Sequence, residues 1–597
     1  MTDRCDDSSN SPLKAWVRAL EMTAPIIRNP SVTLPTRIGE LAEKFGPAVA
    51  LIGDAETLTY RELAQRCNRY ARWALEQGIA SGDVVCLMMT NCPDYVAIWL
   101  GITRTGAIVS LINTHLIGDS LVHAVTTVAP RHVIIAAEFA PVFAAVRTRL
   151  HEIKLWAHGV GQHSLPRVDA DIHGLSGDAI PSSRCPLPSI SDRALYIYTS
   201  GTTGLPKAAN VSHHRLMQWS YWFAGLLDTR STDRMYNCLP MYHSIGGVVA
   251  VGAPLVNGGS IVLRPVFSAR QFWDDIVKWE CTLFQYIGEL CRFLLQSTSA
   301  VAPTGHFIRI CCGNGLRGDI WRQFQERFQI PKILEFYAAT EANFSLYNCE
   351  GRVGAIGRIP SFLAHRFPVA LVRFDVLTGE PMRNATGFCE PCTADEVGEA
   401  ISKISHDRED AGGRFEGYTD KAASERKVLR NVFAAGDAWF RSGDLMRRDT
   451  SGFFYFVDRV GDTFRWKGEN VSTTEVAEIV SRYPGVTDSI VYGVTVPGTE
   501  GRAGMAAVAC KETFDIGEFE KHVAESLPDY ARPVFVRIQG KIEMTVTFKP
   551  KKQDLVRAGF DPTGTTDLIY VKERDAVGYV QLDADMFERI QNGAMRL

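Results

Sequence analysis

The segment from Tyr198 to Lys207 gathers hydroxyl groups, glycines and a lysine directly after an apolar run, Ala194 to Ile197. Gly201 and Gly204 can take backbone angles that other residues avoid, so consecutive N–H groups can turn toward one anion. The hydroxyl groups add donors without bulk, and Lys207 adds a positive charge. We therefore predict a phosphate-binding loop. The residues expected to bind phosphate are Thr199, Ser200, Gly201, Thr202, Thr203, Gly204 and Lys207.

The spacing of this loop is G-x-x-G-x-x-K, which differs from the G-x-x-x-x-G-K-[ST] pattern of a Walker A loop. The chain is therefore not expected to be a P-loop nucleotide hydrolase, and another class of nucleotide enzyme is indicated. A surface turn rich in Ser, Thr and Gly is the alternative interpretation. The order of apolar strand, polar loop and closing lysine favours phosphate binding.

Further motifs follow in a fixed order: Gly313-Asn314-Gly315, Glu335 to Glu341, Arg441 to Asp444, Asp458-Arg459 and Thr547-Phe548-Lys549. With the phosphate loop they resemble the adenylate-forming superfamily, which includes acyl-CoA synthetases, adenylation domains of peptide synthetases and luciferases. Other segments look like the branch of fatty acid transport proteins and very-long-chain acyl-CoA synthetases. They are Phe272 to Asp275, Gln285 to Arg292, Arg465 to Glu475, and the tail from Tyr530 to Phe560.

The resemblance implies a site for ATP and Mg²⁺. Glu341 would hold Mg²⁺, because this hard cation prefers one or two carboxylates together with substrate phosphates. Tyr337, Ala338 and Thr340 would lie at the adenine, and Ala338 stands where the family commonly has glycine. Gly313, Asn314 and Gly315 would bring the backbone against the purine, with the Asn314 amide pairing with its edge. Asp444 would accept hydrogen bonds from the ribose, and Arg459 would donate to ribose or phosphate.

The resemblance also assigns the catalytic lysine to Lys549, which would bridge the α-phosphate and the substrate carboxylate. We count Glu341 and Thr202 with it as catalytic residues. The rest of the basic run, Lys551 and Lys552, is expected to be solvated. Val546 stands where this branch usually has glycine, and a β-branched residue could stiffen the loop.

The lysine has to withdraw before coenzyme A can attack the acyl group, and related enzymes achieve this by rotating the small domain. Gly461 is the expected hinge because glycine absorbs large changes of φ and ψ, although a plain turn is the alternative. Lys467 and Gly468 are expected to face the channel for the CoA thiol.

The apolar stretches Leu216 to Leu227 and Pro240 to Gly247 are expected to line a tunnel for an acyl chain. Each buried methylene contributes about 0.8 kcal/mol, so a long chain can bind mainly by desolvation. His243 could position the acyl carbonyl or gate the tunnel, and a structural histidine is the alternative. His213-His214 is interpreted as the start of a helix.

Bulk composition limits the classes of function. A chain of 597 residues exceeds the usual size of one core, so at least two domains are expected. A formal charge of -3 gives no reason to expect a nucleic acid partner. The 14 cysteines do not show the spacing of a disulfide framework, which favours reduced thiols. Cys389 and Cys392 lack a second pair of ligands, so a zinc site is not expected there.

The chain is expected to be cytoplasmic. Met1 to Pro12 lacks the basic start and apolar centre of a secretory signal. Ser244 to Leu263 carries no charge but is interrupted by glycine, proline and asparagine, so we interpret it as a buried helix, turn and strand and not as a membrane span. Peripheral contact with a membrane stays open.

Alternating apolar runs and helical stretches predict βαβ units in two regions, Tyr60 to Phe139 and Met235 to Phe328. Short strands with Gly, Asp and Asn turns between Gly351 and Arg459 predict a β-rich subdomain. Thr474 to Gln539 predicts helix, strand, strand, helix, strand. The expected fold is thus α/β, with a large N-terminal adenylate-forming domain, 1–458, and a small mobile α+β domain, 459–597, that carries Lys549.

The function implied is a long-chain or very-long-chain fatty acid:CoA ligase that uses ATP, Mg²⁺ and coenzyme A through an acyl-AMP intermediate, and that could drive fatty acid uptake by trapping the acid. Two alternatives remain. One is a CoA ligase for another carboxylate, such as a carnitine-related, aromatic or sterol-derived acid. The other is a fatty acid uptake or binding protein with weak catalysis.

Overall fold

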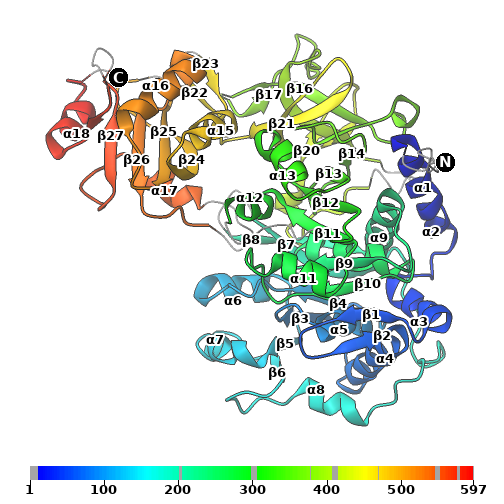
Figure 1. The fold of residues 1–597 in the computed structure, drawn as a ribbon. Helices are drawn as coiled ribbons and strands as arrows, with labels where there is room; N and C mark the ends of the chain where they lie inside the picture. The colour runs from blue at the N-terminus through cyan, green and yellow to red at the C-terminus, as the bar shows by residue number, and fades with distance from the viewer. Residues whose placement is uncertain are drawn as a thin grey trace. The chain divides into compact units, whose positions relative to one another are not determined.

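The computed structural model describes residues 11–200, 205–297, 305–376, 378–405, 414–467, 469–499, 501–544, 551–573, 578–595 and 597. The chain divides into two compact units (Figure 1). The first unit comprises Met1–Phe367 and Ile404–Val428, and the second comprises Pro368–Lys403 and Leu429–Leu597.

One large sheet of the first unit has the strand order β6-β5-β3-β4-β7-β8. All neighbouring pairs are parallel except β7 and β8, which form an antiparallel pair. The strands are β3 (Val84–Met88), β4 (Ile108–Leu111), β5 (His132–Ala136), β6 (Lys154–His158), β7 (Arg193–Ser200) and β8 (Pro206–Ser212).

This sheet is buried on both faces. In β3, Val85 and Leu87 belong to one hydrophobic core, whereas Val84, Cys86 and Met88 belong to another on the opposite face. The reason is the period of two along a strand, which points successive side chains to opposite sides. Parallel strands covered by helices on both faces therefore appear in the sequence as continuous apolar runs.

The second large sheet has the order β14-β13-β12-β11-β9-β10-β1-β2, with antiparallel strands at both edges and parallel pairs between them. Its strands are β1 (Val49–Ile52), β2 (Thr57–Thr59), β9 (Arg234–Asn237), β10 (Ser260–Leu263), β11 (Leu283–Ile287), β12 (Ile310–Asn314), β13 (Ile333–Ala338) and β14 (Ser345–Asn348). The predicted βαβ alternation of both regions is confirmed.

Helices cover these sheets. Helix α4 begins at Tyr60 because the side chains of Thr59 and Glu62 form a capping box. The helices of the first unit include α1 (Pro12–Thr23), α2 (Pro25–Arg28), α3 (Leu34–Phe45), α4 (Tyr60–Glu76), α5 (Pro93–Thr103), α6 (Gly118–Thr127), α7 (Ala140–Ala144), α8 (Val168–Asp171), α9 (His213–Leu227), α11 (Phe272–Lys278), α12 (Gly288–Gln296), α13 (Gly318–Arg327) and α14 (Lys421–Glu425).

The uncharged stretch from Ser244 to Leu263 forms the π-helix η5 (Ile245–Val249), helix α10 (Ala250–Leu255) and strand β10. The predicted helix, turn and strand are therefore confirmed. Among the residues that the structure describes, no helix combines the length and the apolar character that crossing a bilayer requires.

The second unit begins with a β-rich part whose strand order is β21-β20-β18-β16-β17, with β19 beside β20. The strands are β16 (Val369–Asp375), β17 (Glu380–Pro381), β18 (Val397–Lys403), β19 (Val428–Arg430), β20 (Ala438–Arg448) and β21 (Phe453–Arg459). Val372, Ile401 and Val432 belong to its small core.

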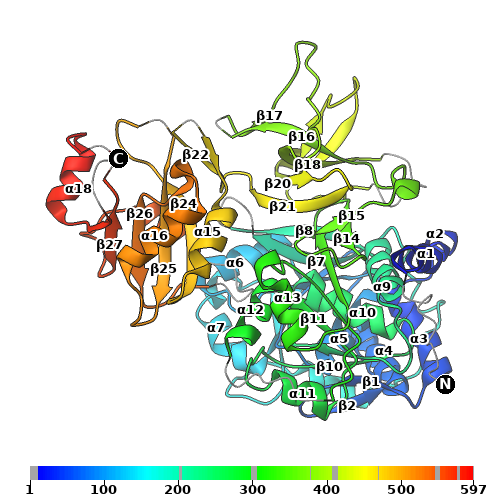
Figure 2. The same ribbon diagram turned by 45° about the horizontal axis from the view of Figure 1, so that its top comes forward.

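The remainder of the second unit follows the predicted order of elements. A ribbon of β22 (Phe464–Trp466) and β23 (Glu469–Val471) precedes a sheet of order β24-β25-β26-β27-β28. Figure 2 shows α15 and α16 across one face of β24 and β25. The other elements are α15 (Thr473–Arg482), β24 (Val486–Val494), β25 (Ala503–Cys510), α16 (Ile516–Ser526), β26 (Phe535–Gln539), α17 (Lys552–Ala558), β27 (Leu568–Val571), β28 (Val580–Gln581) and α18 (Ala584–Gln591).

The part of the second unit after residue 459 has its own hydrophobic core, which includes Phe464, Val480, Tyr492 and Phe535. The β-rich part before it has a separate core. The change from one core to the other between Trp439 and Phe464 is compatible with a domain boundary near residue 459, although the compact units themselves divide the chain at other residues. The boundary between 458 and 459 stays a prediction.

Candidate active site

The predicted phosphate loop connects β7 and β8. In this antiparallel pair Thr199 lies opposite Lys207, and Ser200 lies opposite Pro206. The hairpin therefore brings both ends of the loop together at one edge of the sheet. Its turn residues Gly201, Thr202, Thr203 and Gly204 lie outside the described residues.

Tyr418 contacts both Lys207 and Glu341. No motif in the sequence identifies this aromatic residue as part of the site. The Lys207 Nζ lies 5.9 Å from the centroid of the Tyr418 ring. The Tyr418 hydroxyl donates a hydrogen bond of 2.7 Å to Glu341 Oε1, and Thr199 interacts with the same phenol. Burial and the neighbouring Glu341 carboxylate raise the pKa of Tyr418, so its hydroxyl keeps its proton at neutral pH. Groups distant in sequence thus converge beside the phosphate hairpin.

The backbone around Glu341 is fixed by Arg215 of α9. The Arg215 guanidinium donates to the carbonyl oxygen of Thr340 at 2.7 Å and to that of Ala342 at 3.0 Å. Glu416 accepts hydrogen bonds from the Ser212 backbone and hydroxyl just before α9. Arg215 holds the residues on both sides of Glu341, which limits the directions in which its carboxylate can point.

The residues around Glu341 fit a magnesium ion. Glu341 is a buried residue, 9% exposed. Among the described residues no cluster of three or more acidic, histidine or cysteine side chains forms a protein cage for a metal. Mg²⁺ is usually bound by one or two carboxylates plus substrate phosphates and water, so a lone carboxylate beside a phosphate hairpin is a suitable donor set.

The Gly313-Asn314-Gly315 turn rests on a buried carboxyl group. Glu335 accepts hydrogen bonds at Oε1 from the N–H groups of Gly315 (2.5 Å) and Leu316 (3.2 Å), and at Oε2 from the Tyr286 hydroxyl (2.5 Å). Burial raises the pKa of Glu335 to about 8, against the lowering effect of these hydrogen bonds. Glu335 is part of the family-like motif, but the sequence alone indicates no role for it.

Glycine is needed in this turn for close packing. A side chain at Gly313 would place its Cβ 2.2 Å from the Tyr286 carbonyl oxygen, and Gly315 has a φ of +83°. The Asn314 Oδ1 atom is buried and has no hydrogen-bond partner among the described residues. A buried acceptor of this kind suits the amino group on the edge of an adenine.

The predicted tunnel segments meet at a small cavity of about 40 Å³. Both α9 and η5 contribute to it, together with the end of β13 and the start of β14. Its lining residues are Trp219, Phe223, Ser244, Ile245, Val249, Phe336, Ala338, Ala339, Thr340 and Ser345. The Ser244 and Thr340 hydroxyls lie 3.1 Å apart. The cavity thus has aromatic and aliphatic walls with a polar side next to Glu341.

The start of η5 is packed closely against the preceding turn. A Cβ at Gly247 would lie 1.9 Å from the Met241 carbonyl oxygen, so only glycine fits. Single-turn π-helices are frequent at functional sites. His243 is half-buried, its ring centroid lies 4.6 Å from that of Tyr242, and it does not line the cavity. Its role as a positioning or gating residue stays a prediction.

His213 begins a helix, as the sequence predicts, whereas the adenine contact of Tyr337 stays a prediction. His213 is the first residue of α9, as predicted, and burial lowers its pKa to about 4, so its ring is neutral at pH 7. Tyr337 lies near the end of β13, and its ring centroid is 5.6 Å from that of Phe344.

The nucleotide residues predicted in the second unit lie on adjacent strands. Asp444 of β20 is opposite Arg459 of β21, and Arg459 Nε is 3.7 Å from Asp444 Oδ1. Lys467 Nζ lies 3.2 Å from Asp529 Oδ2 at the surface. Gly468, Val546 and the catalytic candidate Lys549 are outside the described residues.

The expected hinge lies beside a buried carboxylate. Gly461 has a φ of +90°, and a Cβ there would meet nothing within 4 Å. Glycine is therefore favoured here by the backbone conformation and not by close packing. Asp458 is 2% exposed and accepts hydrogen bonds from the Thr473 N–H (2.7 Å) and from the hydroxyls of Thr463 (3.1 Å) and Thr473. Burial raises the pKa of Asp458.

The expectation that Lys552 is solvated is wrong. Its side chain is 19% exposed, and its Nζ lies 3.3 Å from Asp462 Oδ2 and 3.2 Å from the Thr473 hydroxyl. Burial lowers the pKa of Lys552, and the Asp462 and Asp458 carboxylates oppose that effect. The sequence pattern failed because the partners that bury this lysine come from the hinge and from the start of α15, far away in the chain.

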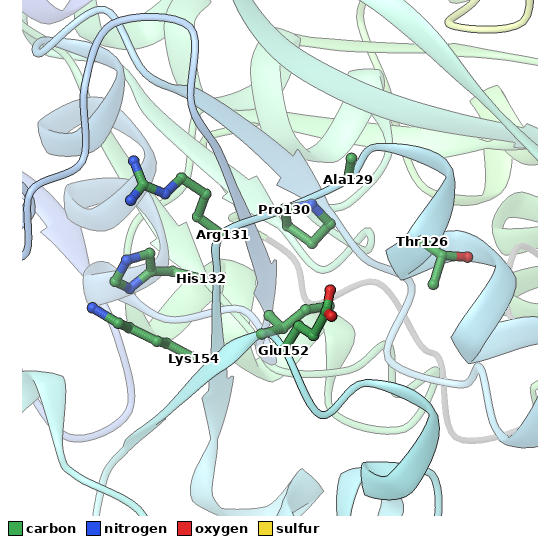
Figure 3. Close-up of a pocket in the computed structure, with 8 residues that line it drawn as sticks. Thr126, Ala129, Pro130, Arg131, His132, Glu152 and Lys154 are labelled. Atoms are coloured by element: carbon green, nitrogen blue, oxygen red, sulfur yellow. The ribbon is translucent and has the colours of Figure 1, made fainter.

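A larger hollow of about 440 Å³ lies elsewhere, where β5 and β6 begin (Figure 3). Arg131, His132 and Lys154 project to one side of it, and Glu152 lies on another. Arg131 is paired with Asp83, and His132 accepts a hydrogen bond from Trp156. None of the predicted site residues lines this hollow.

The fold and these motifs define the class of the protein. A model of AMP-binding enzymes matches residues 39–384, and a model of the AMP-binding enzyme C-terminal domain matches residues 475–549. The chain therefore belongs to the family of AMP-binding enzymes.

Its relatives include Long-chain fatty acid transport protein 1 of Homo sapiens, which is 39% identical over 576 residues, 95% of this chain and 88% of that protein. Long-chain fatty acid transport protein 2 of Rattus norvegicus is 39% identical over 582 residues, 96% of this chain and 92% of that protein. The predicted resemblance to the fatty acid transport protein branch is confirmed.

Solved structures share the fold. The anthranilate CoA ligase AuaEII in complex with anthranoyl-AMP gives a TM-score of 0.76 at 20% identity, covering 88% of this chain and 97% of that one. ATP-bound MatB from Rhodopseudomonas palustris gives 0.74 at 21% identity, covering 88% and 99%. A Mycobacterium tuberculosis fatty acyl CoA synthetase gives 0.63 at 21% identity, covering 88% and 98%. The predicted fold class is confirmed.

Proposed function

We propose that this protein is an ATP- and Mg²⁺-dependent ligase that joins long-chain or very-long-chain fatty acids to coenzyme A through an acyl-AMP intermediate. The observation that carries the proposal is the convergence of Lys207, Tyr418 and Glu341 beside the hairpin of the phosphate loop. Relatives named fatty acid transport proteins support a fatty acid as the substrate.

In the first step an oxygen of the fatty acid carboxylate bonds to the α-phosphorus of ATP, and the bond from that phosphorus to pyrophosphate breaks. Both reactants are anions, so cations and donors must neutralise charge and hold the attack in line. Lys207 and the hydroxyls of the loop would bind phosphate oxygens. Glu341 would hold Mg²⁺, which when bound supplies positive charge to the phosphates. Lys549 would bridge the α-phosphate and the carboxylate.

In the second step the sulfur of coenzyme A bonds to the acyl carbon, and AMP leaves. Lys549 would have to withdraw first, and a rotation at Gly461 would remove it. Gly461 suits this task because glycine can change its φ and ψ widely, and no neighbouring atom lies within 4 Å of the position of a Cβ. Lys467 and Gly468 would then face the thiol.

The acyl chain would enter the cavity between α9 and η5. At about 40 Å³ it has room for only a few water molecules, so a long chain requires side chains such as Trp219 and Ile245 to move aside. The aromatic walls would stabilise the chain by desolvation. Ligation in the cytoplasm, where ATP and coenzyme A are available, would trap fatty acids inside the cell.

The small size of the cavity favours a second candidate, a CoA ligase for a compact aromatic acid. An aromatic ring would contact Trp219, Phe223 and Phe336 without a long tunnel. This candidate differs from the first in substrate and not in mechanism.

A panel of acids from short to very long chains, with aromatic acids included, would test both candidates. Pyrophosphate exchange reports the first step, and acyl-CoA production reports both. We expect the highest kcat/KM with long chains. A maximum with aromatic acids would favour the second candidate, and exchange with none of the acids would refute the enzyme itself.

A further inference from the structure

We propose that Tyr418 is a positioning residue that holds the phosphate-binding lysine and the metal-binding carboxylate at a fixed separation. The inference rests on the proposed function, because it concerns the nucleotide site of that ligase. It assigns a role to a residue outside every motif from which the site was predicted.

The backbone of Tyr418 is fixed to the strand that carries Lys207. The segment around it runs alongside β8, where the Asn210 N–H donates to the Gly417 carbonyl (2.9 Å) and the Thr419 N–H donates to the Ala208 carbonyl (3.0 Å). The Tyr418 N–H donates to the Ser424 hydroxyl at 2.8 Å. These bonds set the register of Tyr418 against Lys207, which is one residue before Ala208 on the same strand.

The side chain of Tyr418 contacts both charged groups. Tyr418 is buried, 7% exposed, its ring lies beneath the Lys207 ammonium group, and its hydroxyl donates to one oxygen of Glu341. An ammonium group over an aromatic face is held by the ring quadrupole without being neutralised. A carboxylate with one oxygen fixed by a donor can present its other oxygen to a metal ion.

This arrangement matters for the charges of Lys207 and Glu341. A lysine and a glutamate that are both needed for ATP would lose much of their charge if they paired directly. The described residues include no ion pair of Lys207, and the Tyr418 side chain contacts both groups, Lys207 with its ring and Glu341 with its hydroxyl. Tyr418 therefore keeps the cation available for phosphate and the carboxylate available for Mg²⁺.

The test compares Tyr418→Phe, which removes the hydroxyl but keeps the ring, with Tyr418→Leu, which removes both. Tyr455 offers a matched control, because its hydroxyl donates to Asp449 at 3.1 Å and the Arg447 guanidinium lies 4.2 Å from its ring centroid. The control variants are Tyr455→Phe and Tyr455→Leu. Binding of a non-hydrolysable ATP analogue is measured by calorimetry with and without Mg²⁺, together with the Mg²⁺ dependence of pyrophosphate exchange.

We expect Tyr418→Phe to raise the Mg²⁺ concentration needed for half-maximal exchange about tenfold, as loss of a hydrogen bond to a charged group would. Analogue binding without Mg²⁺ should stay as in the wild type. Tyr418→Leu should also weaken the Mg²⁺-free binding, because Lys207 loses its support. Both Tyr455 variants should match the wild type in both measurements.

Wild-type Mg²⁺ dependence in Tyr418→Phe would overturn the inference. So would a uniform loss of binding, exchange and thermal stability in that variant, since this would indicate a purely structural role. If the wild type binds the analogue with Mg²⁺ but exchanges pyrophosphate with no acid, the ligase proposal fails and the binding data alone decide the inference. If the wild type shows no Mg²⁺-dependent binding, both fail.

Discussion

Lys552 is ion-paired with Asp462, the residue after the expected hinge Gly461, with 3.3 Å between Nζ and Oδ2. The same ammonium group donates to the Thr473 hydroxyl, which in turn bonds to the buried Asp458. A lysine at the start of α17 is thus tied to the hinge and to the start of α15.

Replacing Lys552 by Met should destabilise the second unit by about 1–3 kcal/mol, because the buried carboxylate of Asp458 and the pair with Asp462 lose their cation. Lys551→Met is a matched control, since Lys551 is exposed and pairs only with the exposed Glu543 in the described structure. Thermal unfolding followed by fluorescence measures the difference. Equal midpoint temperatures of unfolding for the two variants would show that the contact between Lys552 and Asp462 contributes nothing to stability.

Glu341→Gln should lower pyrophosphate exchange at least 100-fold at physiological Mg²⁺, because an uncharged amide is a poor magnesium ligand. The Tyr418 hydroxyl can still donate to the amide oxygen, so the fold should be kept. A titration with Mg²⁺ should restore part of the rate. Glu326→Gln on the exposed face of α13 serves as the control, and an unchanged rate in Glu341→Gln would remove the metal assignment.

Glu335 should make stability depend on pH. Burial raises its pKa to about 8, above the ordinary value of 4.5, so the folded protein retains a proton that the unfolded chain has lost between these values. Its contribution to stability is therefore fully present below pH 4.5 and is lost as the pH rises toward 8, at up to about 1.4 kcal/mol per unit.

Glu335→Gln removes this titration while its amide can still accept from Gly315 and donate to Tyr286. The difference in unfolding free energy between the variant and the wild type should grow in favour of the variant from pH 5 to pH 8. Urea unfolding at several pH values measures it. A constant difference would mean that Glu335 is ionised in the folded protein throughout this range.

Trp219→Ala should shift the preference toward longer or bulkier acids, because Trp219 limits the cavity between α9 and η5. The ratio of kcat/KM for a long acid over a short one should rise about tenfold, equivalent to roughly two methylene groups of contact. Trp219→Phe should give an intermediate ratio. A ratio unchanged in both variants would place the acyl chain elsewhere.

The sequence predicted the helices and strands better than the side-chain contacts between residues distant in the chain. β3, β24 and α4 were predictable because apolar periodicity and capping residues act locally. The positions of Thr199, Lys207 and Glu341 followed from motifs. Tyr418, Arg215 and Lys552 could not be found this way, because their roles come from partners distant in the chain that only the fold brings together.

The most direct test of the account is a comparison of Lys549→Ala with Lys551→Ala in the two half-reactions measured separately. Lys549→Ala should abolish pyrophosphate exchange with fatty acids and keep most of the transfer of a presynthesised acyl-AMP to coenzyme A, whereas Lys551→Ala should keep both. Equal loss of both half-reactions in Lys549→Ala, or exchange at the wild-type rate, would contradict the proposed ligase mechanism.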